Sequence, residues 1–287
     1  CSMLFVDGKF DTLCRYRCIL ANLNTSLLMK NLIFKLLYSI NLILEESTKR
    51  GDIQSFISKL RPYTTEKELI RLGPSGDGGY LVPDDLKDIE ACFSPGVGEL
   101  FGFEIDCASL GMKVYLSDAS VNSPNISEFQ FQSKFIGPVT YHNFITVDDW
   151  VNSQQLSPDS DLLLQMDSEV YEYLSIVSMS SEVLNRFRII VLEVHNLNKL
   201  GNLQFFNLVN SAVDKLLLNH TCVHIHPNNY RKVDTRLGYE IPRALELTFF
   251  RNDRFSEKRP TNSFPHVLDS DSSSKKHFAL PDIWYKK

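Results

Sequence analysis

The chain has 287 residues, 43% of them hydrophobic and 19 of them phenylalanine, so it can bury a sizeable core. Its formal net charge is −5 and no segment carries a basic stripe, which argues against nucleic acid as the main partner. Six scattered cysteines without a CxxC pair favour reduced thiols in a cytoplasmic protein over disulfides or zinc ligands. The chain starts at Cys1, so we expect further domains of a longer polypeptide as neighbours.

The first 65 residues are expected to form a helical extension or linker ahead of a main domain over residues 66–287. Apolar residues at nearly helical spacing predict a helix over residues 26–46, and a second short helix is expected over residues 52–60. Lysine and asparagine interrupt the first helix, which makes it too polar to span a membrane. We therefore expect it to pack on the domain, with a helix on a membrane surface as the alternative.

From residue 90 the chain alternates short apolar runs with segments of helical pattern, which predicts buried parallel strands joined by crossover helices. The polar loop at residues 227–243 has no helical pattern, so the last two strands are expected to form an antiparallel hairpin. The expected strands are residues 91–93, 114–116, 135–139, 162–166, 189–194, 222–225 and 245–250, and the expected helices are residues 99–110, 126–132, 147–154, 170–187 and 202–218.

A glycine turn follows the first of these strands, at Gly96, Val97 and Gly98, and the second strand ends at Asp118 and Ala119. Glycines let the backbone approach a ligand closely, and a carboxylate at a strand tip can accept two hydrogen bonds from a ribose. Both NAD and S-adenosylmethionine (SAM) satisfy this pattern.

Two further features lie beside this turn in the predicted fold. Glu104, in the helix that follows the glycines, either lines the cofactor site or belongs to a solvated helix face. Asp77 precedes two glycines and Tyr80, a pattern typical of a hairpin turn. The alternative is that Asp77 and Tyr80 lie over the cofactor pocket and contact the substrate.

Ionisable residues gather at the ends of the fourth and fifth strands. Asp167, Glu193 and His195 are expected at the edge of the sheet where open α/β folds bind ligands. Carboxylates this close need a proton or a cation, so Asp167 and Glu193 could hold Mg²⁺ or Mn²⁺ with His195 nearby. The alternative is a structural carboxylate beside an ordinary loop histidine.

The sixth strand carries His224 and His226 on one face, because side chains alternate along a strand, and Asn229 follows in the loop. This arrangement is consistent either with substrate contact or with two structural histidines.

Six motifs in order, spread over roughly residues 68–253, together resemble the FkbM-type SAM-dependent methyltransferases. They are RLGPSGDGGYLVP at residues 71–83, the segment 94–103, LQMDSE at 164–169, IVLEVH at 190–195, VHIHPNN at 223–229 and LELTF at 245–249. The family usually has glycine where this chain has Val170. Nothing in the first 65 residues resembles the family.

The resemblance implies a Rossmann-like, seven-stranded methyltransferase sheet that ends in a β-hairpin. It implies an O-methyltransferase that uses SAM and acts on a small-molecule or glycan hydroxyl. An oxygen acceptor must lose its proton, so His195 is the first choice of base, and a metal that lowers the hydroxyl pKa is the alternative. Membrane association is not expected. The alternatives are a nicotinamide-dependent oxidoreductase, which predicts a helix within residues 227–243, and a non-catalytic methyltransferase-like scaffold.

Overall fold

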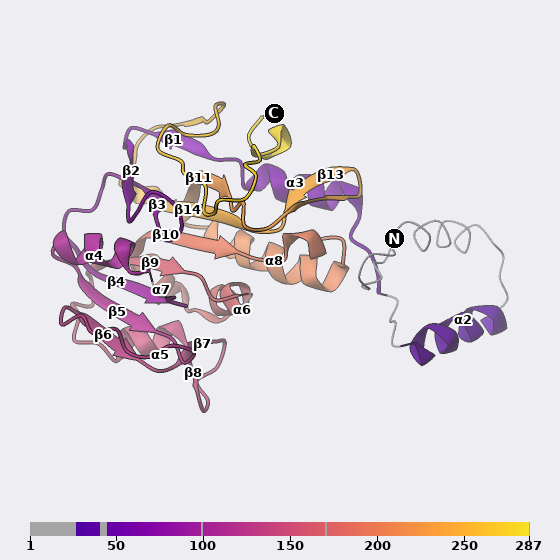
Figure 1. Ribbon diagram of the computed structural model, residues 1–287, viewed down its shortest axis with the longest axis horizontal. Coiled ribbons are helices and arrows are strands. Elements are labelled where there is room, and N and C mark those ends of the chain that lie inside the picture. The colour runs from indigo at the N-terminus through magenta and orange to yellow at the C-terminus, as the bar shows by residue number, and fades with distance from the viewer. Residues whose placement is uncertain (1–26, 41–44, 99, 170, 287) are drawn as a thin grey trace.

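A central sheet of seven strands organises this mixed α/β protein (Figure 1). The computed structural model describes residues 27–40, 45–98, 100–169 and 171–286. In spatial order the sheet consists of β11 (His220–Pro227), β14 (Leu245–Arg251), β10 (Phe187–Val194), β9 (Asp161–Met166), β4 (Ile89–Pro95), β5 (Lys113–Ser117) and β6 (Phe129–Gln132). Strand β14 runs antiparallel to β10 and β11, and the pairs from β10 to β6 are parallel, an arrangement compatible with a Rossmann-like fold.

Two hydrophobic clusters pack on the two faces of this sheet. Ile190 and Leu192 of β10 join one cluster, whereas Ile189 and Val191 join the other, as the alternation of side chains along a strand requires. The first cluster is covered by helices α3 (Arg50–Lys59), α5 (Val147–Asn152), α6 (Tyr171–Ser178), α7 (Ser181–Arg186) and α8 (Leu203–Leu216). The second is covered by α4 (Gly102–Ser109) and the hairpin of β2 (Leu69–Leu72) and β3 (Tyr80–Pro83).

Side-chain caps fix the starts of three of these helices. Thr146, Ser180 and Asn202 each accept a hydrogen bond from a backbone N–H of the first turn, which satisfies a donor that would otherwise lack a partner. The cap at Ser180 also explains why the single helix expected over residues 170–187 is wrong. The chain ends α6 at Ser178 and starts α7 at Ser181 instead.

The third sheet strand was expected over residues 135–139, and this prediction is wrong. The sheet uses β6, where a helix over residues 126–132 was expected, and Ser117 pairs with Gln132. Residues 135 and 136 form β7 (Phe135–Ile136), which pairs with β8 (Phe144–Ile145) outside the main sheet. Strand β6 is at the sheet edge and is partly exposed, so it lacks the continuous apolar run of a central strand.

The remaining elements are small. The loop expected to lack a helix contains a hairpin of β12 (Val233–Arg236) and β13 (Tyr239–Pro242), so that prediction is confirmed. The other elements are β1 (Tyr63–Thr65), which pairs with β15 (Lys258–Pro260), and the 3₁₀ turns η1 (Leu197–Lys199), η2 (Asn252–Arg254) and η3 (Asp282–Trp284).

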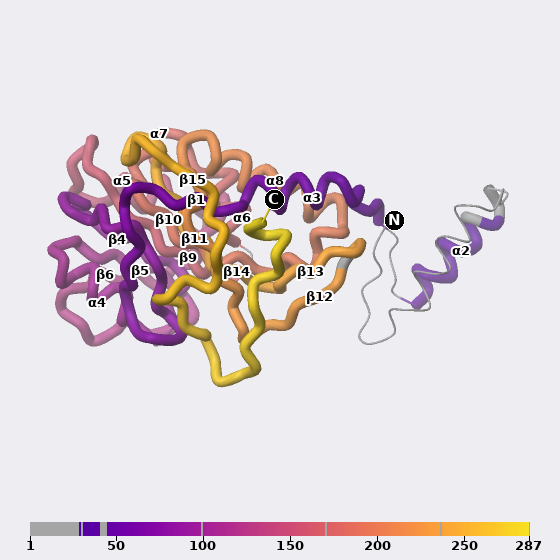
Figure 2. Tube along the Cα trace, turned by 90° about the horizontal axis from the view of Figure 1, so that it is seen from above, coloured from indigo at the N-terminus to yellow at the C-terminus, as the bar shows by residue number. Residues whose placement is uncertain are grey.

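The expected N-terminal helical extension is described only in part, because residues 1–26 and 41–44 lie outside the described residues. Helix α2 (Leu27–Ser39) lies apart from the body in both views, with Leu32, Phe34 and Tyr38 exposed (Figures 1 and 2). Helix α3, in contrast, buries its apolar side chains in the first cluster. Among the described helices, none combines the length and apolar character that crossing a membrane requires.

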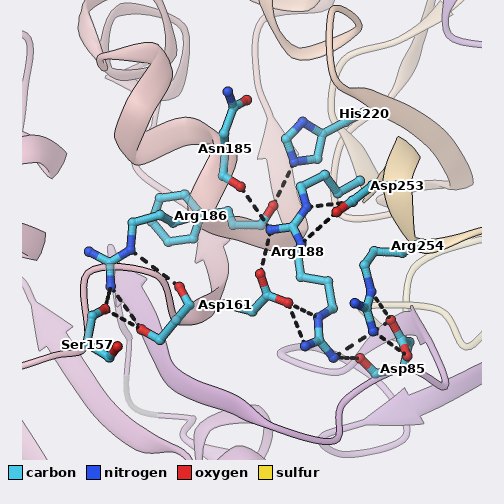
Figure 3. A network of polar contacts seen from close by, with 12 residues as sticks. Asp85, Ser157, Asp161, Asn185, Arg186, Arg188, His220, Asp253 and Arg254 are labelled. Atoms are coloured by element: carbon cyan, nitrogen blue, oxygen red, sulfur yellow. Dashed lines mark hydrogen bonds and ion pairs between the residues drawn. The ribbon is translucent and has the colours of Figure 1, made fainter.

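Arginine–aspartate pairs join the strands at the edge of the sheet where β9 and β10 begin (Figure 3). Arg188 is buried, and its Nη2 lies 2.6 Å from Asp161 Oδ2. The other carboxylate oxygen of Asp161 is 2.6 Å from Nη1 of Arg251, at the end of β14. Asp85 accepts a hydrogen bond from Arg254 Nε at 2.8 Å. This network stabilises the ends of the strands that lie opposite to the candidate site.

Candidate functional site

The glycine turn lies where β4 ends, in contact with the end of β9. Gly96 has a φ of +80°, and a Cβ built on it would lie 1.6 Å from the carbonyl oxygen of Asp167. Only glycine fits there, because both the conformation and the space exclude a side chain. A Cβ on Gly98 would meet nothing within 4 Å, so the backbone at that position borders open space.

That open space is a cavity of about 140 Å³, here named the glycine-loop cavity. Its described lining combines the turn, the β2–β3 hairpin and the end of β9. The lining residues are Asp77, Gly78, Tyr80, Gly96, Val97, Gly98, Leu100, Glu104, Gln165 and Asp167. The sequence placed six of these in the cofactor site or beside it, and Glu104 is one of them, with its side chain buried.

Buried polar side chains form the floor of the glycine-loop cavity. Ser94 Oγ lies 2.6 Å from Glu104 Oε1 and 2.7 Å from Gln165 Oε1, and Gln165 Nε2 donates to Tyr80 Oη at 3.3 Å. Burial raises the pKa of the Glu104 carboxyl and of the Tyr80 hydroxyl. The hairpin turn expected at Asp77 is present between β2 and β3, and it lines this cavity; a contact of Asp77 and Tyr80 with a cofactor or substrate stays a prediction.

Asp118 directly follows β5, at the strand tip where it was expected, but it is not among the described residues that line this cavity. Its Oδ1 accepts hydrogen bonds from Ser120, from the backbone N at 2.7 Å and from Oγ at 2.6 Å. Ala119 lies in the same turn and is also absent from the described lining. A ribose contact at Asp118 stays a prediction.

The strand ends bring Asp167, Glu193 and His195 together. One ligand atom from each lies within 4.8 Å of the others. His195 Nε2 is 3.4 Å from Glu193 Oε1 and 3.6 Å from Asp167 Oδ1. On its other side, Nδ1 lies 3.4 Å from Oε1 of Glu172, a fully buried carboxylate in α6, and that oxygen also accepts the backbone N–H of His195 at 3.0 Å.

The charges of this cluster depend on one another. Burial disfavours the His195 cation, but hydrogen bonds with Glu172 and Glu193 outweigh burial and raise its pKa to about 11. Burial and the nearby charge of Glu193 raise the pKa of Asp167 to about 8. Hydrogen bonds with Glu172 and Glu193 therefore favour the His195 imidazolium at neutral pH, a form that donates hydrogen bonds and does not accept a proton.

A second cavity of about 190 Å³, here named the carboxylate cavity, opens over this cluster. It shares Asp77 and Asp167 with the glycine-loop cavity. The described lining is Asp77, Asp167, Glu169, Glu193, His195, Asn228, Tyr230, Arg231 and Ser272. The two cavities are therefore neighbours with a common wall.

His224, His226 and Asn229, the expected substrate contacts, are buried beneath the C-terminal chain and are not among the described lining residues. His224 Nε2 lies 3.0 Å from Asp269 Oδ1, and Asn229 Oδ1 accepts the Ser273 N–H at 2.8 Å. These residues hold the C-terminal chain in place.

Sequence reasoning missed Glu172, Asp269 and Ser272. The last two lie in a polar, serine-rich tail without periodicity, and only the fold brings that tail to the sheet. Glu172 lies in the first turn of α6, six residues after β9 ends at Met166, and only the packing of α6 against β10 brings it to His195. Val170, where the chain departs from the FkbM-type pattern, lies outside the described residues.

No family model matches this chain, and no curated protein matches it. The resemblance to the FkbM-type enzymes therefore rests on the motifs alone.

Proposed function

We propose that the chain is a SAM-dependent O-methyltransferase that acts on a hydroxyl of a sugar or glycan. The observation that carries this proposal is the common wall of the two cavities at Asp77 and Asp167. A methyl donor held against the glycine turn would present its methyl group toward the carboxylate cavity, where an acceptor hydroxyl would lie.

The strand order supports this proposal over a nicotinamide-dependent oxidoreductase. The classic dinucleotide sheet has six strands in the order 3-2-1-4-5-6. Here the seventh strand, β14, lies between the fifth and sixth, antiparallel to both. Apart from the connection between β5 and β6, which has no helix among its described residues, this is the plan of βα units and a final hairpin that the methyltransferase resemblance implies. The region between β11 and β14 contains β12 and β13, where the oxidoreductase alternative requires a helix.

The charge of the lining gives independent support. The glycine-loop cavity presents three carboxyl groups, Asp77, Glu104 and Asp167, and no lysine or arginine among its described residues. SAM carries a sulfonium and an ammonium against one carboxylate, so an acidic pocket favours it. The pyrophosphate of NAD would find no lysine or arginine to pair with among the described lining residues.

A divalent cation fits the cluster at the common wall. Asp167 Oδ1 is buried without a hydrogen-bond partner, and Glu193 and His195 supply the other two ligand atoms. Carboxylate oxygens suit Mg²⁺ and Mn²⁺. Such an ion would act as a Lewis acid that lowers the pKa of an acceptor hydroxyl.

The protein's own task is alignment, since the methyl group of SAM is already activated for displacement. The Gly96 turn fixes the donor side, and Glu193 accepts a hydrogen bond from Asn228 Nδ2 at 2.8 Å that holds it in place. Without a divalent ion, Asp167 is the group best suited to take the hydroxyl proton, because its pKa of about 8 lies near neutral pH. The Tyr173 hydroxyl and the Glu172 carboxylate fix the backbone of His195, whose imidazolium would stabilise the resulting charge.

Calorimetry with S-adenosylhomocysteine (SAH), SAM and NAD tests this proposal. We expect both SAM and SAH to bind with one site per chain and NAD to show no heat of binding. Binding of NAD in place of SAH would overturn the proposal.

A further inference from the structure

One wall of the carboxylate cavity comes from the C-terminal tail, far along the chain from the motifs. We name residues 266–275 the C-terminal strap, and its Ser272 is among the residues that line the cavity. Figure 2 shows the yellow C-terminal chain leaving β15, looping out and returning toward α3. The inference below rests on the proposed function, because it concerns the acceptor of that reaction.

Two anchors fix the strap on β11 and the loop that follows it. Asp269 lies between two buried histidines, with Oδ1 3.0 Å from His224 Nε2 and Oδ2 3.6 Å from His226 Nδ1. Asn229 Nδ2 donates to the carbonyl of Ser273 at 2.9 Å, and its Oδ1 accepts the N–H of the same residue. Paired contacts on both sides of Ser272 give it a defined position in the cavity wall.

Ser272 is also held from beneath. Its Oγ donates to Oε1 of Glu246 at 2.9 Å. Glu246 is paired in the sheet both with Glu193 on β10 and with His226 on β11, so Ser272 is tied to the strand neighbour of a cluster carboxylate. Since its hydrogen is used in this bond, Ser272 presents lone pairs to the cavity.

The rest of the described lining contains more carboxyl groups than cationic side chains, which are His195 and Arg231. It includes four carboxyl groups, those of Asp77, Asp167, Glu169 and Glu193. Arg231 Nη2 lies 3.6 Å from Glu169 Oε1 and is partly neutralised by it. Asn228 uses its amide N–H in the bond to Glu193 and its oxygen in a bond from the Tyr230 N–H at 2.8 Å.

A ligand that fills this space is therefore favoured if it supplies a donor to Ser272 and adds no negative charge to the acidic lining. We infer that the acceptor is a neutral or amino sugar unit without carboxylate or phosphate, and that Ser272 of the strap is a specificity-determining contact for one of its hydroxyl or amino groups. The cluster of Asp167, Glu193 and His195 can bind the reacting hydroxyl, and Ser272 of the strap would contact another group of the same sugar ring.

Ligand-observed NMR with three matched glycosides tests the charge preference, in the presence of SAH and MgCl₂. The probes are methyl β-glucopyranoside, its 2-amino analogue and the corresponding glucuronide. The neutral and amino glycosides are expected to bind at least about tenfold more tightly than the glucuronide. Equal or tighter binding of the glucuronide, as chelation of a metal by its carboxylate would produce, overturns the inference. So does binding of SAH without binding of any glycoside, whereas loss of SAH binding itself overturns the proposed function.

The substitution Ser272→Ala tests the strap, with Ser274→Ala as the matched control because Ser274 is exposed on the same strap. We expect Ser272→Ala to weaken binding of the best glycoside about threefold to tenfold, the loss of one hydrogen bond, while the Kd for SAH stays unchanged and the Tm falls slightly because Glu246 loses a donor. Ser274→Ala should change none of the three. Unchanged glycoside binding in Ser272→Ala would remove Ser272 from the acceptor site.

Discussion

At the scale of single residues, the site combines groups whose positions follow from strand ends with groups that only the tertiary fold supplies. Asp167, Glu193 and His195 could be predicted because parallel strands end at one edge of a sheet. The effect of Glu172 on the pKa of His195 could not be predicted, since it depends on how α6 packs against β10. That contact changes the expected role of His195, because it favours the imidazolium over a free base.

The charge state of the cluster gives the first prediction. The folded-state pKa values of Asp167 and His195, about 8 and about 11, are both raised, so the folded state holds these protons more tightly than the unfolded chain. Stability from these groups is therefore present at low pH and is lost as pH rises through these values. In EDTA, the free energy of unfolding should fall between pH 6.5 and 8. In Asp167→Asn this slope should be shallower by about 1 kcal/mol per pH unit, one proton's share. Equal slopes in urea titrations of the two proteins would contradict the assignment.

Asp118 gives the second prediction at this scale. If it binds the adenosine ribose, Asp118→Ala should weaken SAH binding by about 1.5–3 kcal/mol, the range for a hydrogen bond to a charged group. Ser120→Ala is the control, because it removes the hydroxyl that donates a hydrogen bond to Asp118 and keeps the Asp118 carboxylate. Calorimetry should show a near-normal Kd for the control. Equal losses in both variants would indicate that Asp118 only shapes its own turn.

At the scale of elements, the sequence predicted central strands well and edge elements poorly. Strands β9 and β10 are continuous apolar runs, and each is buried along almost its whole length. Strand β6 alternates polar and aromatic residues at an edge, where propensity and packing give weaker signals. The strap has no hydrophobic periodicity, so no local pattern in the sequence could predict that it packs against β11.

The glycine turn of β4 provides a prediction at this scale. Gly96→Ala should cost at least about 3 kcal/mol in stability, because strain at positive φ adds to a direct clash with the Asp167 backbone. Gly111→Ala is the control for conformation alone. Gly111 has a φ of +89° but no neighbour within 4 Å, so the change should cost about 1–2 kcal/mol. Chemical denaturation of both variants makes the comparison, and equal costs would show that the turn tolerates a side chain.

The arginine network in Figure 3 provides a second prediction at the scale of elements. Arg188→Met leaves Asp161 and Asp85 without a buried partner and should cost about 3–5 kcal/mol. Arg254→Met removes a more exposed partner of Asp85 and should cost about 1 kcal/mol or less. Thermal unfolding monitored by circular dichroism should rank the two in this order. The reverse order would mean that Arg188 is not central to the network.

At the scale of the whole molecule, the two ends of the central strands have different tasks. The arginine network stabilises the fold where β9 and β10 begin, and the candidate site lies where these strands end. The glycine turn, the cluster and the strap come from residues almost two hundred positions apart, yet they surround two cavities with a common wall. The proposed methyl transfer depends on that shared wall, since the donor and the acceptor must meet across it.

A crystal structure of the complex with SAH tests this claim most directly. We expect the ligand in the glycine-loop cavity, in contact with Gly96 and Gly98, with its sulfur directed toward Asp167 and the carboxylate cavity. SAH bound elsewhere, or with its sulfur directed away from Asp167, would contradict the account.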